Sequence, residues 1–241
     1  MGPVDRISLM LDSVEPPPAA RVVHDRPPLW AVWSSAFTPT VLIVGWVVAG
    51  AVQPPGYDPL QQTISVLSGH GVAHSWIMTT ALYCVAVSYL ATSVGLRTVH
   101  TSARMIIAFG GAAGLGVAYF PQPAGGSTFD HMFFAVAGAG LLALWPFVMA
   151  YWRPSIPLRG DRASGWTVWQ RLVSREGLIV CGLVVALSVL AMYVTAQAGM
   201  YLGLTERICT GLQALLPFFI AVGLRRTAVV EDSDRAGSRA C

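Results

Sequence analysis

Ionisable residues that could do chemistry together lie in three short segments of this chain, next to apolar stretches. They are Asp58, Asp130, His131, Glu206 and Arg207. A histidine beside a carboxylate titrates near neutral pH and can act as a general acid or base. His131 with Asp58 or Glu206 is therefore a candidate catalytic set for a lipid-modifying hydrolase or transferase. The structural alternative is that the carboxylates stabilise helix starts and His131 lies at headgroup level.

Arg207 indicates a different chemistry, because an arginine at the start of a helix opposes the helix dipole and needs compensation. The compensating group is either an acidic partner, Asp58 or Glu206, or a lipid phosphate held by two hydrogen bonds. Together with Asp58, Ser65 and His131, Arg207 is the candidate for binding a lipid headgroup.

A metal site is a weaker possibility. His70 and His74 are four residues apart, a spacing that aligns two imidazoles on a helix for zinc. The two histidines flank Gly71, and the glutamate that follows the first histidine of a zinc protease is missing. We therefore expect no metal and no cofactor, and interpret both histidines as solvated.

The elements that must position these residues follow from composition. Of 241 residues, 54% are hydrophobic and 11% are charged, whereas about 25% are charged in an average soluble domain. Six apolar stretches are each close to the ~20 residues that cross a bilayer as a helix. They are residues 31–52, 75–95, 105–120, 132–151, 177–197 and 208–224. The sequence predicts an all-α membrane protein with six transmembrane helices, and excludes a soluble enzyme or a nucleic-acid-binding protein.

Orientation follows from the arginines, since cytoplasmic loops carry an excess of basic residues. With the N-terminus inside, 14 of the 15 arginines are cytoplasmic and Arg207 is the exception. We thus expect a multi-pass protein of the cell membrane with both termini in the cytoplasm. The transmembrane domain spans residues 30–226, between disordered cytoplasmic tails at 1–29 and 227–241. No ionisable residue lies inside the six stretches, which argues against proton-coupled transport; a transporter without proton coupling stays open.

A short helix is expected on the outer surface. Asp58 could cap it, Pro59 suits its first position, and Gln61 completes a capping pattern. The predicted helix runs from about Pro59 to Ser68 and is amphipathic, with Leu60, Ile64 and Leu67 on one face. Ser127 and Asp130 form a similar capping pattern before the fourth helix. An amphipathic stretch at the inner membrane surface is expected around Trp169.

Three outer segments together carry a family resemblance. They are Tyr57-Asp58 with the run from Thr63 to Leu67, Phe120-Pro121 with the glycine-rich loop before His131, and the run from Gly203 to Ile208. The chain thereby resembles the bacterial DUF998 family of six-helix integral membrane proteins, which is similar to membrane proteins of the Frag1, DRAM and Sfk1 type. The family usually has an acidic residue where this chain has Val66. The resemblance implies the six-helix fold and a shared outer site.

The function expected from these observations is engagement of lipid headgroups at the outer polar site, which would organise the membrane or a membrane complex. Expected partners are membrane lipids and a membrane protein or a second copy of the chain, with no nucleic acid. The alternatives are the hydrolase or transferase that uses His131, and the transporter.

Overall fold

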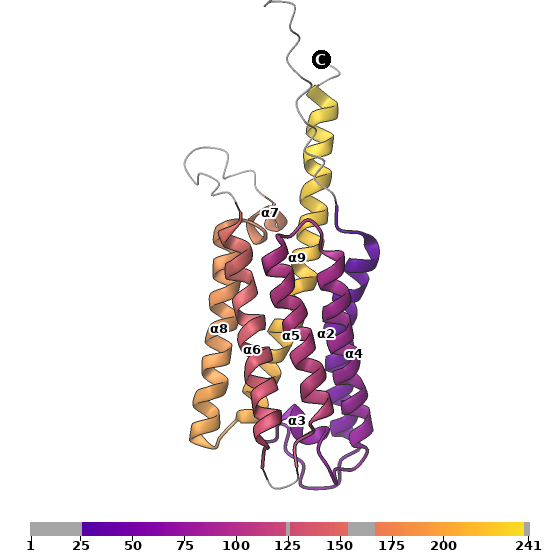
Figure 1. Ribbon diagram of the computed structural model, residues 1–241, viewed down its shortest axis with the longest axis vertical. Coiled ribbons are helices and arrows are strands. Elements are labelled where there is room, and N and C mark those ends of the chain that lie inside the picture. The colour runs from indigo at the N-terminus through magenta and orange to yellow at the C-terminus, as the bar shows by residue number, and fades with distance from the viewer. Residues whose placement is uncertain (1–25, 124–125, 154–166, 239–241) are drawn as a thin grey trace, which may run out of the picture.

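The structure is a computed structural model that describes residues 26–123, 126–153 and 167–238 (Figure 1). All regular elements within these ranges are helices, which confirms the predicted all-α class. Six helices are long and apolar enough to cross a membrane, as predicted. They are α2 (Leu29–Ala51), α4 (Ser75–Gly95), α5 (Thr101–Tyr119), α6 (Phe129–Tyr151), α8 (Arg175–Ala198) and α9 (Leu202–Ser238).

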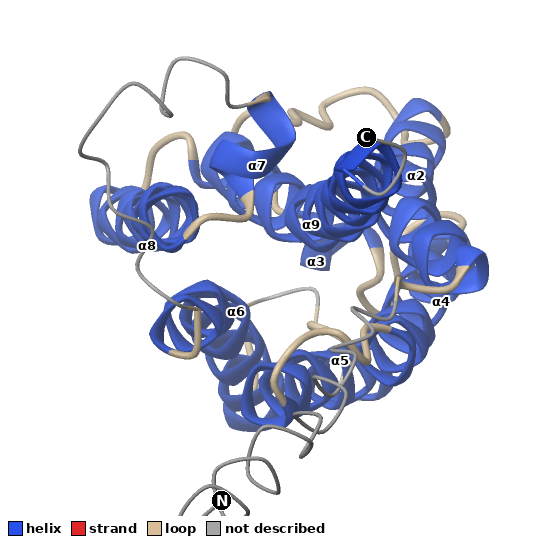
Figure 2. Cartoon of the chain, turned by 90° about the horizontal axis from the view of Figure 1, so that it is seen from above, coloured by secondary structure: helices blue, strands red, loops and turns tan. Residues whose placement is uncertain are grey.

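The long helices form a ring in sequence order. Each packs against the next, and α9 closes the ring by packing against α2 (Figure 2). Small residues allow close approach: a Cβ atom on Gly110 of α5 would lie 2.7 Å from Leu142 of α6, and one on Gly114 would lie 3.3 Å from Ala86 of α4. These two glycines thus allow close packing of helices within the bundle.

The two ends of the bundle differ. One end carries the short helix α3 (Ile64–Leu67) and is called the α3 end; the other carries α7 (Val168–Leu172) and is called the α7 end (Figure 1). Arg225 in α9 donates to the carbonyl of Pro27, just before α2, over 2.7 Å. The first helix therefore begins at the same end at which the last helix leaves the bundle.

Helix α4 has the bounds that the sequence predicted, 75–95, and the other five long helices begin earlier than the apolar stretches. The fifth and sixth long helices start at Arg175 and Leu202, and α6 is capped by Thr128, whose hydroxyl accepts from the His131 amide over 3.2 Å, and not by Ser127. Ionisable residues such as Arg175 and Glu206 therefore lie near the starts of the membrane-crossing helices. The expectation that these helices lack ionisable residues holds only away from their ends.

The predicted surface helix from Pro59 to Ser68 is wrong in extent, because only Ile64–Leu67 is helical. Asp58 does cap the chain locally, with Oδ1 accepting from the Leu60 amide over 2.8 Å, but only one turn follows. The carbonyls of Leu60 and Gln61 accept from the start of α9 and so are not available to continue a helix. Ile64 and Leu67 are buried, so α3 is tucked into the bundle.

Helix α9 continues past Arg226, where the sequence predicted a tail, and ends at Ser238. Residues 225–236 contain no glycine or proline, so no residue in this run interrupts the helix. The predicted N-terminal tail lies outside the described residues except for its last four positions, 26–29. The stretch around Trp169 contains the five-residue helix α7, with a capping box between Thr167 and Gln170.

Candidate functional site

The loop between α2 and α3 is fastened over the start of α9. The amide of Leu204 donates to the carbonyl of Leu60 over 3.0 Å, and the amide of Gly203 donates to that of Gln61 over 3.2 Å. The Gln61 side chain accepts from the Tyr201 amide over 2.9 Å. The first amides of a helix have no partner within it. Here the loop supplies those partners.

Gly203 makes this contact sterically possible. A Cβ atom at this position would lie 2.3 Å from the carbonyl oxygen of Gln62 and 2.6 Å from that of Pro59. Both obstacles are backbone atoms, which cannot rotate away. The helix and the loop therefore pack at a distance that only glycine permits.

Arg207 lies one turn further along α9 and holds the same loop. Its Nη1 atom donates to the carbonyls of Pro59, Gln62 and Gly203 over 2.7 Å, 2.8 Å and 2.8 Å. Its Nη2 atom donates to the hydroxyl of Tyr57 over 2.6 Å. All four acceptors are neutral oxygens, so none of these bonds is the ion pair with Asp58 or Glu206 that the sequence allowed as one alternative.

Tyr57 does not neutralise this arginine. Burial raises the pKa of the Tyr57 phenol above its ordinary value of 10.0, although the nearby Arg207 guanidinium pulls the pKa in the opposite direction. The phenol thus stays protonated at physiological pH and accepts the hydrogen bond as a neutral group. Four neutral hydrogen-bond acceptors thus surround the Arg207 guanidinium, and the neighbouring Glu206 carboxyl interacts with it electrostatically.

Glu206 contacts the same segment from the neighbouring position on α9. One carboxylate oxygen accepts from the amide of Ile64, the first residue of α3, and the other accepts from the Ser65 hydroxyl over 3.3 Å. A carboxylate is favourable at the start of a helix because it receives otherwise unpaired amides. The contact region of residues 57–65 with Tyr201, Gly203, Glu206 and Arg207 is called the loop–α9 junction below.

His131 lies apart from these contacts. Its side chain is only 2% exposed, and its Nδ1 donates to the carbonyl of Phe120 over 2.7 Å. This bond holds the second loop of the α3 end against the start of α6. Within the described residues, the hydrogen bonds of His131 and Glu206 go to different partners, so they provide no support for a shared acid–base set.

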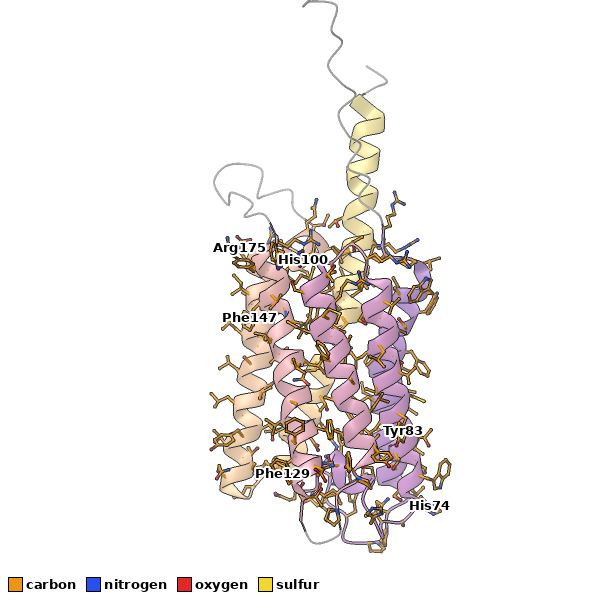
Figure 3. All side chains as sticks on the ribbon, in the orientation of Figure 1. His74, Tyr83, His100, Phe129, Phe147 and Arg175 are labelled. Carbon is orange, nitrogen blue, oxygen red and sulfur yellow. The ribbon has the colours of Figure 1, made fainter. Side chains whose placement is uncertain are left out.

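His70 and His74 lie in the loop between α3 and α4, so their spacing of four residues does not align them on a helix. The His70 amide donates to the carbonyl of Gln122 over 3.1 Å, which joins the two loops of the α3 end. His74 has a φ of 53° just before α4 (Figure 3). In the described parts of the chain, no group of three His, Cys, Asp or Glu side chains is arranged to hold a metal ion.

The structure thus brings together Asp58, Ser65, Glu206 and Arg207 through one loop, and leaves His131 at a neighbouring loop. Sequence reasoning missed Tyr57, Gln61 and Gln62 as partners of α9 and did not assign a role to Gly203. A glycine four residues before an arginine at a helix start is a signal that could have indicated close contact of this turn with another backbone.

Six membrane-crossing helices in a closed ring, with a polar junction at one end, define a multi-pass membrane protein. The chain belongs to the family described as protein of unknown function (DUF998), whose model matches residues 39–223. The match includes all three segments that meet at the α3 end. No curated protein and no solved structure matches the chain.

Proposed function

We propose that the protein binds the headgroup of an anionic phospholipid at the loop–α9 junction, and thereby organises the surrounding membrane or a neighbouring membrane complex. The observation that carries this proposal is the half-buried charge of Arg207, whose four hydrogen bonds all go to neutral oxygens. An anionic group that reaches this guanidinium gains electrostatic attraction to its positive charge and further hydrogen bonds from its N–H groups.

The guanidinium has donors to offer. It carries five N–H groups, and the hydrogen bonds found among the described residues use Nη1 and Nη2 but not Nε. Nε and Nη2 form one edge of the guanidinium, which matches two oxygens of a phosphate. The loop carbonyls fix the side chain in advance, so little conformational freedom is lost when the phosphate binds.

The surroundings of the junction suit a lipid headgroup. Exposed aromatic side chains surround the α3 end, on α4, α5, α6 and the turn before α9: Trp76, Tyr119, Phe129 and Tyr201. Aromatic residues of this kind mark the boundary between the bilayer and water. With both termini in the cytoplasm, as the arginines predict, this boundary is the outer leaflet of the cell membrane.

Catalysis by His131 with Asp58 or Glu206 is the less supported alternative. His131 donates to a backbone carbonyl, Asp58 accepts from a backbone amide, and Glu206 accepts from the start of α3. Each of the three side chains therefore stabilises a different backbone segment, which favours structural roles over a shared catalytic one.

Lipid analysis of the purified full-length protein tests the proposal. Wild type in mild detergent should retain a distinct anionic phospholipid by mass spectrometry, and Arg207→Gln should lose it. Arg226→Gln is the matched control, since it removes an exposed arginine at the α7 end. A wild-type lipid profile equal to the bulk membrane overturns the proposal.

A second variant separates charge from loop structure, because Arg207 also holds the loop. Tyr57→Phe removes one loop contact and leaves the charge in place, so it should retain the lipid. Loss of lipid from Tyr57→Phe and Arg207→Gln alike, with both variants still folded, would contradict a role for the guanidinium as the lipid ligand.

A further inference from the structure

A second polar region lies at the α7 end, where the chain passes from α4 to α5 beside the end of α6 (Figure 3). It is a pocket of about 450 Å³. Two of the described residues that line it are arginines and none is acidic. The polar and aromatic members of the wall are Arg97, Thr98, His100, Thr101, Trp152 and Arg153.

His100 is held in a defined position within this wall. Its ring stacks on the indole of Trp152, with ring centroids 4.0 Å apart and planes 12° apart. Its Nδ1 accepts from the Ser102 amide over 3.3 Å and lies 2.8 Å from the Ser102 hydroxyl. Because an amide can only donate, Nδ1 is the acceptor and the ring proton is on Nε2. Nε2 is therefore a hydrogen-bond donor.

Two further features of the wall suit an anion. The Thr98 hydroxyl oxygen is buried in the wall and has no hydrogen-bond partner among the described residues, which is unusual for a buried polar group. Thr101 is the first residue of the 19-residue helix α5. The start of such a helix carries partial positive charge and unpaired amides.

We propose that this pocket binds a phosphate group, with Arg97 and Arg153 as the charged ligands and His100 and Thr98 as neutral donors. The phosphate comes from a phospholipid headgroup or from free phosphate, and the chemistry of recognition is the same for both. Tyr151 and Trp152 are exposed at the end of α6, as at a membrane boundary. The site is at the opposite end from the loop–α9 junction and does not depend on the proposed function.

The test is a titration of the purified full-length protein with dioleoylphosphatidic acid, followed by native mass spectrometry. Dioleoylglycerol, which has the same acyl chains and no phosphate, is the lipid control. The comparison is made in the Arg207→Gln background, so that the loop–α9 junction does not contribute: there, adding Arg97→Gln/Arg153→Gln should weaken phosphatidic acid binding at least about tenfold. Arg226→Gln, which removes an exposed arginine outside the pocket, should bind it as wild type does. Equal binding of phosphatidic acid with and without Arg97 and Arg153 excludes a lipid headgroup as the ligand of this pocket, as does an equal loss in Arg226→Gln, and the proposal is then overturned unless inorganic phosphate protects the two arginines.

A labelling experiment on wild type keeps the test valid if the double variant does not fold. Phenylglyoxal modifies accessible arginines, and bound phosphatidic acid should slow modification of Arg97 and Arg153 but not of Arg226. Inorganic phosphate distinguishes the sources: protection by millimolar phosphate and not by the lipid identifies free phosphate as the ligand, and the reverse identifies the headgroup. Protection by neither probe overturns the proposal.

Discussion

The Nη2 atom of Arg207 lies 2.6 Å from the hydroxyl of Tyr57, a hydrogen bond between the loop after the first membrane-crossing helix and the start of the last. It completes a set of bonds in which one guanidinium binds three backbone carbonyls and a phenol. The loop between α2 and α3 is therefore held in position by Arg207, which lies far along the sequence, and not by a helical propensity of the loop itself.

Tyr57→Phe tests the value of this bond. The substitution removes the acceptor and leaves a charged donor unpaired, so we expect a loss of about 1.5–3 kcal/mol in the free energy of unfolding. Chemical unfolding of the purified protein in detergent measures it. Tyr119→Phe, at an exposed tyrosine of the same end, should change the stability little; equal effects of the two variants would assign no special value to the bond.

Gly203→Ala tests the close approach of α9 to the loop. The added Cβ would meet two backbone carbonyl oxygens at less than 3 Å, so we expect destabilisation of about 1–3 kcal/mol or more. Gly140→Ala in α6 is the matched control, because a Cβ there has no neighbour within 4 Å. Alanine favours a helix by about 0.5–1 kcal/mol over glycine, so this control should be neutral or stabilising. A Gly203→Ala variant as stable as wild type would show that the loop is not packed in this way.

Glu206→Ala tests the cap on α3. Removing the carboxylate leaves the Ile64 amide without its acceptor, so we expect faster hydrogen exchange at Ile64 and a loss of about 1–3 kcal/mol in stability. Asp130→Ala is the control, since that carboxylate is exposed in the first turn of α6, and it should cost below about 1 kcal/mol. Unchanged exchange at Ile64 would contradict the cap.

His131 offers a matched pair of variants. His131→Asn keeps a donor for the Phe120 carbonyl, whereas His131→Leu fills a similar volume and leaves that carbonyl unpaired. We expect the leucine variant to be less stable than the asparagine variant by about 1–3 kcal/mol in thermal or chemical unfolding. The opposite order would show that apolar volume at position 131 contributes more to stability than the hydrogen bond to Phe120.

The orientation in the membrane is tested by labelling of intact cells. In a background without the native cysteines, His74→Cys at the α3 end should react with a membrane-impermeant maleimide, and Arg226→Cys at the α7 end should react only after the membrane is permeabilised. The reason is the excess of arginines at the α7 end. Reversed labelling would place the α3 end in the cytoplasm.

The six long helices could be predicted from the sequence because length and hydropathy are properties of each segment alone. Most of their starts could not, since residues such as Glu206 are polar and yet helical, and a distant partner holds them in place. The capping pattern at Asp58 correctly predicts a turn. The turn does not continue as a helix, because the carbonyls of Leu60 and Gln61 accept hydrogen bonds from amides at the start of α9.

The candidate site could likewise be predicted only in part. The need for a group to compensate Arg207 follows from its place in a helix. That this group consists of carbonyls from residues 59 and 62 does not follow, since the contacts join parts of the chain more than 140 residues apart. His131 was placed near the correct helix start, but its burial depends on the fold of the loop around Phe120.

The ring of helices, closed by contact of α9 with α2, has a consequence for the order of synthesis. A chain leaves the ribosome from its N-terminus onward, so the loop that follows α2 is made long before the helix start that fastens it. Until α9 enters the membrane, Pro59 and Gln62 lack their arginine and the ring is open on one side. The last helix to be inserted is thus the one that completes both the bundle and the α3 end, and a nascent chain cut short before Leu202 would have neither.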